Sequence, residues 1–287
     1  MKKIGSILSC FVPFIIAIAM QVGVGIVVGM VYGVIQGVKL GVSGITDPNE
    51  ISTAITESMT GDFPLAINIF VGVCCIVLFG LLYKRSYVKE NKIKLKEVFS
   101  GKTLLWVTLL GVGLQIGIAL LLNLVASLKP EWFDSYNELM KQLGGGSSLL
   151  SFIAIVIIAP ISEELIFRGI IFEKCKKAMP LIVANILQAA LFGVMHFNII
   201  QGLYAFALGL FLGMVCNKRR SIVVAIVLHF MFNLSGVLLD LILTDELFNL
   251  PIILVVMFLF SLAITVFSTL KIAKDNFQIV KNEVVIE

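Results

Sequence analysis

Two adjacent carboxylates and a guanidinium lie inside an otherwise apolar run, in the segment Pro160-Ile-Ser-Glu-Glu-Leu-Ile-Phe-Arg168. A charge at bilayer depth costs about 2.5–3.5 kcal/mol or more, so such residues face a bundle interior or a water-filled cavity. On a helix, Glu164 and Arg168 stand four residues apart and can neutralise each other. Glu163 lies about 100° around the helix without a local partner and could serve as a general base. Pro160 frees a backbone carbonyl just before the pair, so a kink or local opening is expected there.

The chain has two histidines, and both lie in or at the edges of later apolar runs. His196 follows Phe192 by four residues, and His229 precedes Asn233 by four residues. Taken alone, either histidine could be a hydrogen-bonding contact between helices, and the Glu–Arg pair could be a structural clamp. Their coincidence favours chemistry, because each cluster supplies a group that hydrolysis uses. At about 1.5 Å per residue, His196 should lie deeper from the cytoplasmic flank than the other clusters.

The elements that must position these groups are predicted to be membrane-spanning helices. Of the residues, 59% are hydrophobic and 14% are charged, whereas a soluble domain has roughly a quarter charged. We therefore expect an all-α, polytopic bundle of about eight transmembrane helices. The apolar runs fall near residues 11–35, 64–82, 104–127, 149–172, 181–199, 201–216, 221–240 and 251–270.

The positive charges alternate between the two sides of these runs. With eight spans, 18 of the 22 Lys and Arg residues fall on one side. The positive-inside rule makes that side cytoplasmic, with both termini there. The basic residues follow this topology and not one face of the protein, so no nucleic-acid partner is expected.

Three stretches follow from this organisation. Residues 1–145 form an N-terminal region of three spans, 146–240 the catalytic core of spans four to seven, and 241–287 a final span and cytoplasmic tail. The stretch 130–143 has aromatic and apolar residues at helical spacing and predicts a short amphipathic helix in the outer headgroup region. The apolar and aromatic face of this helix comprises Trp132, Phe133, Tyr136, Leu139, Met140 and Leu143.

Glycines at four-residue spacing predict close helix packing in two places. One stripe runs along the first span, from Gly25 to Gly41, and its partner could be this chain or a second copy. A shorter pair, Gly209 and Gly213, lies in the sixth span.

Three motifs carry a resemblance to a known family. Glu163-Glu164-Leu-Ile-Phe-Arg168, Phe192-Gly-Val-Met-His196 and His229-Phe-Met-Phe-Asn233 resemble the EExxxR, FxxxH and HxxxN motifs of the CAAX-prenyl-endopeptidase and bacteriocin-processing (CPBP, Abi) family. The motifs occur in the family's order on successive helices, and the resemblance covers about residues 150–235. It implies an eight-helix intramembrane endopeptidase.

The resemblance also implies roles for these residues. Glu163 and His196 would activate water, and His229 and Asn233 would bind the tetrahedral oxygen. Glu164 and Arg168 would position the first group. A preorganised oxyanion donor in a dry site contributes about 3–4 kcal/mol, and the bundle must also hold a wet cavity.

The sequence leaves the metal question open. Glu163, His196 and His229 could form a zinc site of two histidines and one carboxylate, but they lie on different helices and lack the HExxH spacing. Metal-free glutamate chemistry is the preferred interpretation. A rhomboid-type serine mechanism is disfavoured, since Ser147 and Ser148 lie in an expected loop.

Two other functions keep the same residues. A non-proteolytic membrane partner, in bacteriocin self-immunity or as a regulator of another membrane protein, would use them as a buried polar network. A transporter could relay protons through them, although the two halves show no repeated broken helices. The expected partners of a protease are a peptide or membrane-protein substrate and the lipid bilayer. The Lys- and Ile-rich composition with short loops suggests a bacterial cytoplasmic membrane.

Overall fold

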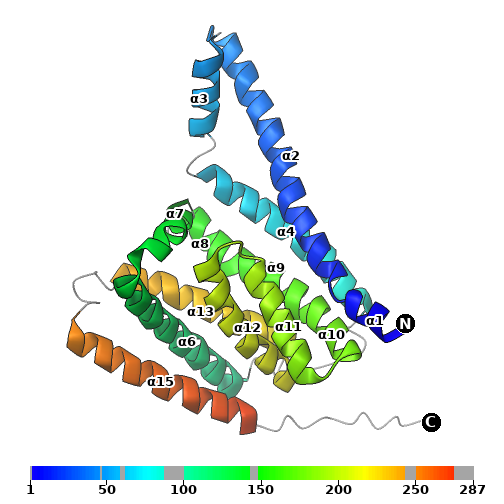
Figure 1. Cartoon of the computed structure of the whole chain (residues 1–287), viewed down its shortest axis with the longest axis vertical. Coiled ribbons are helices and arrows are strands. Elements are labelled where there is room, and N and C mark those ends of the chain that lie inside the picture. The colour runs from blue at the N-terminus through cyan, green and yellow to red at the C-terminus, as the bar shows by residue number, and fades with distance from the viewer. Residues whose placement is uncertain are drawn as a thin grey trace.

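The computed structural model describes residues 2–45, 47–58, 62–86, 100–142, 148–242 and 250–274, which form helices and no strand (Figure 1). The α-helices are α1 (Lys2–Leu8), α2 (Val12–Val42), α3 (Pro48–Ser58), α4 (Asp62–Ser86), α6 (Gly101–Leu128), α7 (Asp134–Gln142), α8 (Leu149–Phe152), α9 (Ala159–Glu164), α10 (Phe172–Ala178), α11 (Leu181–Val194), α12 (Ile199–Arg219), α13 (Ile222–Ile242) and α15 (Pro251–Lys274). A 3-10 helix, η1 (Pro130–Phe133), precedes α7, and two π-helices, η3 (Ile153–Ile158) and η4 (Leu165–Ile171), flank α9.

Each of the eight apolar runs contains a helix. Seven helices of the described chain are long and apolar enough to cross a membrane, and the fourth of them is the continuous stretch Leu149–Ala178 from α8 to α10. The remaining run, the fifth along the chain, contains the shorter α11, which has 14 residues. The predicted all-α membrane bundle is thereby confirmed, and the chain is an integral membrane protein.

The basic ends of the helices lie on one side of the bundle. In Figure 1 the carboxyl ends of α4, α10 and α15 point toward the lower right, while α3 and α7 lie on the opposite side. Lys84 and Arg85 end α4, Lys176 and Lys177 end α10, and Lys271 and Lys274 end α15. This arrangement follows the predicted alternation, and the assignment of the basic side to the cytoplasm remains a prediction.

The π-containing fourth span forms the centre of the bundle. It packs against α4, α11, α12 and α13, and α6 lies on α13 with α15 on its outer side (Figure 1). Gly72 of α4 allows a close approach to this span, since a Cβ there would collide with Ile158 and approach Ser162. Gly213 of α12 also allows a close approach between helices, because a Cβ there would collide with Asn185 of α11. Close packing at this predicted glycine pair is therefore confirmed.

The helix α2 differs from the rest. It rises away from the bundle to meet α3 (Figure 1), and its buried residues Pro13, Phe14 and Ala17 all lie in its first two turns. Nothing within 4 Å would meet a Cβ on Gly25, Gly29 or Gly41. The predicted glycine stripe therefore has almost no partner among the described residues of this chain.

The predicted amphipathic helix is present as η1 and α7, and part of its apolar face lies against the bundle. Phe133 is buried, and Tyr136, Leu139 and Met140 line a cavity inside the bundle. Trp132 remains exposed, and Leu143 lies outside the described residues.

Candidate active site

The backbone of the fourth span opens where Pro160 predicts it. In η3 the Ala159 amide donates to the Ala154 carbonyl, five residues back. The next amide in this register would bond Ile155, but it belongs to Pro160, which has no N–H. The Asn233 side chain donates to the Ile155 carbonyl instead, at 2.7 Å. Asn233 of the third motif thus binds the carbonyl that Pro160, just before the first motif, leaves open. The π-helical turns of this kind are frequent at functional sites.

The predicted Glu164–Arg168 ion pair is present at the centre of the bundle. Arg168 Nη1 lies 2.8 Å from Glu164 Oε1, and both side chains are fully buried. Arg168 Nη2 donates to the Gly209 carbonyl of α12 at 3.2 Å, and its guanidinium lies 4.5 Å from the centre of the Phe192 ring. These contacts join the first motif to α11 and α12. They compensate the charge of a fully buried guanidinium.

His229 lies between the two glutamates. Its Nδ1 is 2.9 Å from Glu164 Oε1, and its Nε2 is 3.7 Å from Glu163 Oε2. An ionised carboxylate only accepts hydrogen bonds, so Nδ1 carries the proton that Glu164 binds. The Glu164–Arg168 ion pair therefore positions His229 directly. The resemblance had implied that this pair positions the water-activating group.

The adjacent glutamates have different surroundings. Glu164 is fully buried, whereas 26% of the Glu163 side chain is accessible. Glu163 lines a cavity of about 430 Å³, and its nearest ionisable contact among the described residues is His229. Glu163 is thus the carboxylate that a ligand in the cavity can touch.

His196 lies in a turn and not within a helix. The helix α11 ends at Val194, and the chain reverses through Phe197, whose φ is 51°. A carbonyl only accepts, so His196 Nδ1 donates to the Phe192 carbonyl at 2.8 Å, and neutral His196 leaves Nε2 as an acceptor. The Phe192 ring packs edge-on against both imidazoles, with centroids 4.9 Å from His196 and 5.7 Å from His229.

One cavity collects groups from all three motifs. Glu163, His196, His229 and Asn233 all line it, although a depth estimate from straight helices placed His196 apart. The early end of α11 and the turn after it explain the difference. No direct contact joins His196 to Glu163 within the described residues, so a molecule in the cavity would have to bridge them.

Further polar residues line the same cavity and were not singled out from the sequence. They come from α2, α4, α6, α7, α9, α12 and α13, and comprise Gln21, Asn68, Gln115, Tyr136, Ser162, Gln201, Tyr204 and the carboxylate of Asp240. Asn68 and Gln115 are isolated amides within apolar runs, a signal that could have indicated them. Tyr136 lies on α7, outside the spans, where burial raises its pKa. These groups extend the polar lining toward the side of α7.

The candidate zinc ligands do not form a ligand set. Among the described residues, no group of three or more His, Cys, Asp and Glu side chains is placed to hold a metal ion. Glu163 and His229 approach each other, but the one hydrogen bond of His196 within the described chain goes to a backbone carbonyl. The three residues as arranged here do not fit a site of two histidines and one carboxylate, which requires all three within about 2.2 Å of one ion.

Comparison with known proteins finds a similarity to one family in this part of the chain. Residues 145–235 match the family described as "Type II CAAX prenyl endopeptidase Rce1-like". The matched segment contains all three motifs and the helices that carry them. Neither the curated proteins nor the solved structures include a match to the chain.

Proposed function

Because residues 145–235 match the type II CAAX prenyl endopeptidases, we propose that this chain hydrolyses a peptide bond in a membrane-associated peptide or protein. The observation that carries the proposal is the shared cavity. Its lining includes the Glu163 carboxylate of α9, the His196 imidazole of the turn after α11, and the imidazole and amide of His229 and Asn233 on α13. Peptide hydrolysis requires a base for water and donors for the oxyanion, and these are the groups present.

Glu163 is the proposed general base. It is the accessible member of the glutamate pair, and its carboxylate would take a proton from a water molecule as the water oxygen attacks the carbonyl carbon. His196 Nε2 would accept the second hydrogen bond of that water, because its Nδ1 proton is held by the Phe192 carbonyl. Glu163 would then return the proton to the amine nitrogen as the C–N bond breaks. The products are a carboxylic acid and an amine.

His229 and Asn233 are the proposed oxyanion donors. His229 would donate from Nε2 in its doubly protonated form, while its Nδ1 proton stays on the Glu164 carboxylate. Asn233 uses one Nδ2 hydrogen on the Ile155 carbonyl and retains the other for the tetrahedral oxygen. Arg168 holds Glu164 in place, so it is a positioning residue. No step is assigned to a metal ion, since the candidate ligands do not gather into a site.

Substrate would reach the cavity from the side of α7. The lining includes residues of α7, the first turns of α12 and the last turns of α13, all on the side away from the basic helix ends. If the basic side is cytoplasmic, the substrate is a peptide at the outer surface of the membrane.

The test is cleavage of a quenched fluorogenic peptide library by the purified protein in detergent. Glu163→Gln, which keeps the shape of the side chain and removes its basicity, should lower the rate by about 10²–10⁴-fold. The matched control is Glu131→Gln, at an exposed carboxylate outside the cavity, which should retain the wild-type rate. A metal chelator should leave both results unchanged.

Two outcomes would refute the protease. One is the absence of cleavage across the library with folded protein. The other is equal cleavage by wild type and Glu163→Gln. A cellular phenotype that persists in Glu163→Gln would then favour the non-proteolytic partner.

A further inference from the structure

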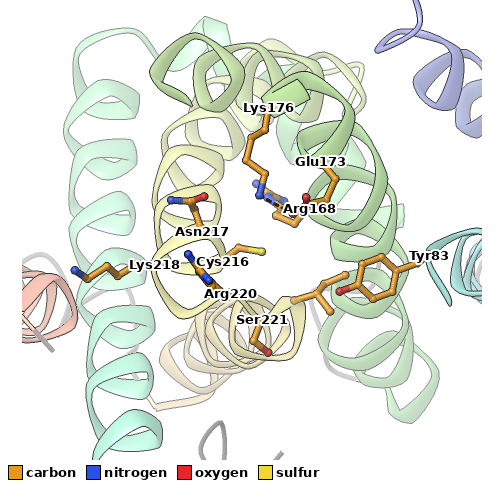
Figure 2. Close-up of a pocket in the computed structure, with 10 residues that line it drawn as sticks. Tyr83, Arg168, Glu173, Lys176, Cys216, Asn217, Lys218, Arg220 and Ser221 are labelled. Atoms are coloured by element: carbon orange, nitrogen blue, oxygen red, sulfur yellow. Dashed lines mark hydrogen bonds and ion pairs between the residues drawn. The ribbon is translucent and has the colours of Figure 1, made fainter. Parts of the chain in front are cut away.

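A second cavity, of about 450 Å³, lies at the basic end of the bundle (Figure 2). It is formed by the end of α4, by η4 and α10, by the end of α12 and by the start of α13. Its lining residues are Tyr83, Arg168, Glu173, Lys176, Cys216, Asn217, Lys218, Arg220, Ser221 and Ile222. Of the residues proposed for hydrolysis or its positioning, only Arg168 borders this cavity.

The charge of this basic cavity is strongly positive. Four cationic side chains line it against one carboxylate, Glu173, which Lys176 already binds at 2.7 Å. Figure 2 shows Lys176 extending into the cavity, whereas Lys218 points away from its centre. Arg220 is exposed and forms no ion pair with the described residues. Four cations line the cavity against one carboxylate, so the lining carries an excess of positive charge.

Arg168 supplies a second, independent observation. Its side chain is fully buried, yet it lines the basic cavity, and its Nε–H has no hydrogen-bond acceptor among the described residues. Its two terminal nitrogens are used by Glu164 and by the Gly209 carbonyl. A buried donor without an acceptor is energetically unfavourable, so it points to an acceptor supplied by a ligand.

The backbone around the cavity also favours an anion. Arg220 adopts the left-handed conformation with φ 48°, and the amides of Arg220 and Ser221 bind the last carbonyls of α12. The carbonyl oxygens of Cys216 and Asn217, which would repel an anion, thus already accept hydrogen bonds from these amides. The helix α13 begins at Ile222, and the first amides of a helix present a partial positive charge.

We propose that the basic cavity binds a phosphate group, held by Lys176, Arg220 and Arg168. The cavity lies at the helix ends that carry the positive charges, where the phosphates of anionic lipids are found in a membrane. The group could therefore belong to a lipid headgroup or to a free phosphate, and the chemistry of recognition is the same. This site does not depend on the proteolytic function proposed above.

The test is thermal unfolding of the full chain in neutral detergent and phosphate-free buffer, followed by tryptophan fluorescence. Three probes are compared: dioctanoyl phosphatidylglycerol, inorganic phosphate, and dioctanoylglycerol, which lacks the phosphate. Saturating phosphatidylglycerol should raise the Tm of wild type by about 5 °C or more. The double variant K176Q/R220N should lose this shift, and K176R/R220K should keep it. Asn is chosen at position 220 because it tolerates the left-handed conformation.

The matched control is K102Q/K274Q, which removes two exposed lysines at the same end of the bundle but outside the cavity. It should show the wild-type shift. A shift with both phosphate-containing probes supports a site for the phosphate group itself, and a shift with the lipid alone supports a headgroup site. The proposal is overturned if neither probe shifts the wild type, if K176Q/R220N shifts as much as wild type, or if dioctanoylglycerol is equally effective.

Discussion

The helices α2 and α12 are both apolar enough to cross a membrane, but they differ in what they bury. In its 31 residues α2 buries three, all in its first two turns, whereas the 21 residues of α12 bury nine, including two glycines and an arginine. The polar contacts show the same difference: α12 accepts hydrogen bonds from Arg168 and Gln188 at one carbonyl, that of Gly209. Apolar length is enough to make a span. Polar groups and small residues at matched positions give a span a specific place in the bundle.

The largest effect on stability is expected at the clamp inside the packed region. Arg168→Met leaves the Glu164 carboxylate buried without its counter-charge, which should cost about 3–5 kcal/mol of unfolding free energy. The measurement is denaturant unfolding in detergent, followed by circular dichroism. The double variant E164Q/R168M should regain part of the loss, because no charge is then left unpaired. If R168M unfolded with the free energy of the wild type, the buried ion pair would not distinguish the packed region from α2.

A smaller loss is expected at the contact between α13 and the fourth span. Asn233→Ala leaves the Ile155 carbonyl unpaired and should cost about 1–3 kcal/mol. It should also lower the cleavage rate by about 10²–10³-fold, since one oxyanion donor is removed. The exposed Asn49→Ala on α3 is the control and should change neither quantity. Full activity in Asn233→Ala would exclude Asn233 as an oxyanion donor.

The glycine contact between α11 and α12 is a test of packing alone. A Cβ on Gly193 would lie 2.5 Å from the Gly202 carbonyl oxygen, so Gly193→Ala should cost about 1–3 kcal/mol. The unfolding midpoint of this variant would show whether the backbones can separate at low cost. An unchanged midpoint would mean that this crossing is loose.

The smallest effect is expected on α2. Nothing within 4 Å would meet a Cβ on Gly25, so Gly25→Ala should change the unfolding free energy of the monomer by no more than about 0.5 kcal/mol. The same substitution chemistry at Gly193 and Gly25 makes the two variants a matched pair. A large loss at Gly25 would show that α2 is packed in solution, by a second copy or by the part of the chain outside the described residues.

Much of the fold could be predicted from composition and spacing. Each of the eight apolar runs contains a helix because lipid requires every backbone polar group to be satisfied within its own segment. The ion pair of Glu164 and Arg168 follows from four-residue spacing on a helix, and its presence confirms that prediction. The opening at Pro160 is equally local, since it depends on the one amide that proline lacks.

Long-range contacts could not be predicted in this way. The Ile155 carbonyl is bound from 78 residues away, and no spacing rule connects Asn233 to it. The end of α11 at Val194 also escaped prediction, because the apolar run continues and the reversal depends on the Gly193–Gly202 crossing. The spacing of the α7 residues likewise predicted the helix but not its contacts with the bundle. The catalytic roles of the cavity residues remain predictions.

The shortness of α11 has a consequence for how the protein meets its bilayer. Fourteen helical residues rise about 21 Å, whereas the hydrocarbon core of a membrane is about 30 Å thick. Next to α11 the bilayer must thin, or water and headgroups must descend toward His196, and either adjustment would bring water to the proposed site of hydrolysis. We therefore expect the acyl chain length of the surrounding lipids to change the cleavage rate, with faster turnover in thin membranes than in thick ones.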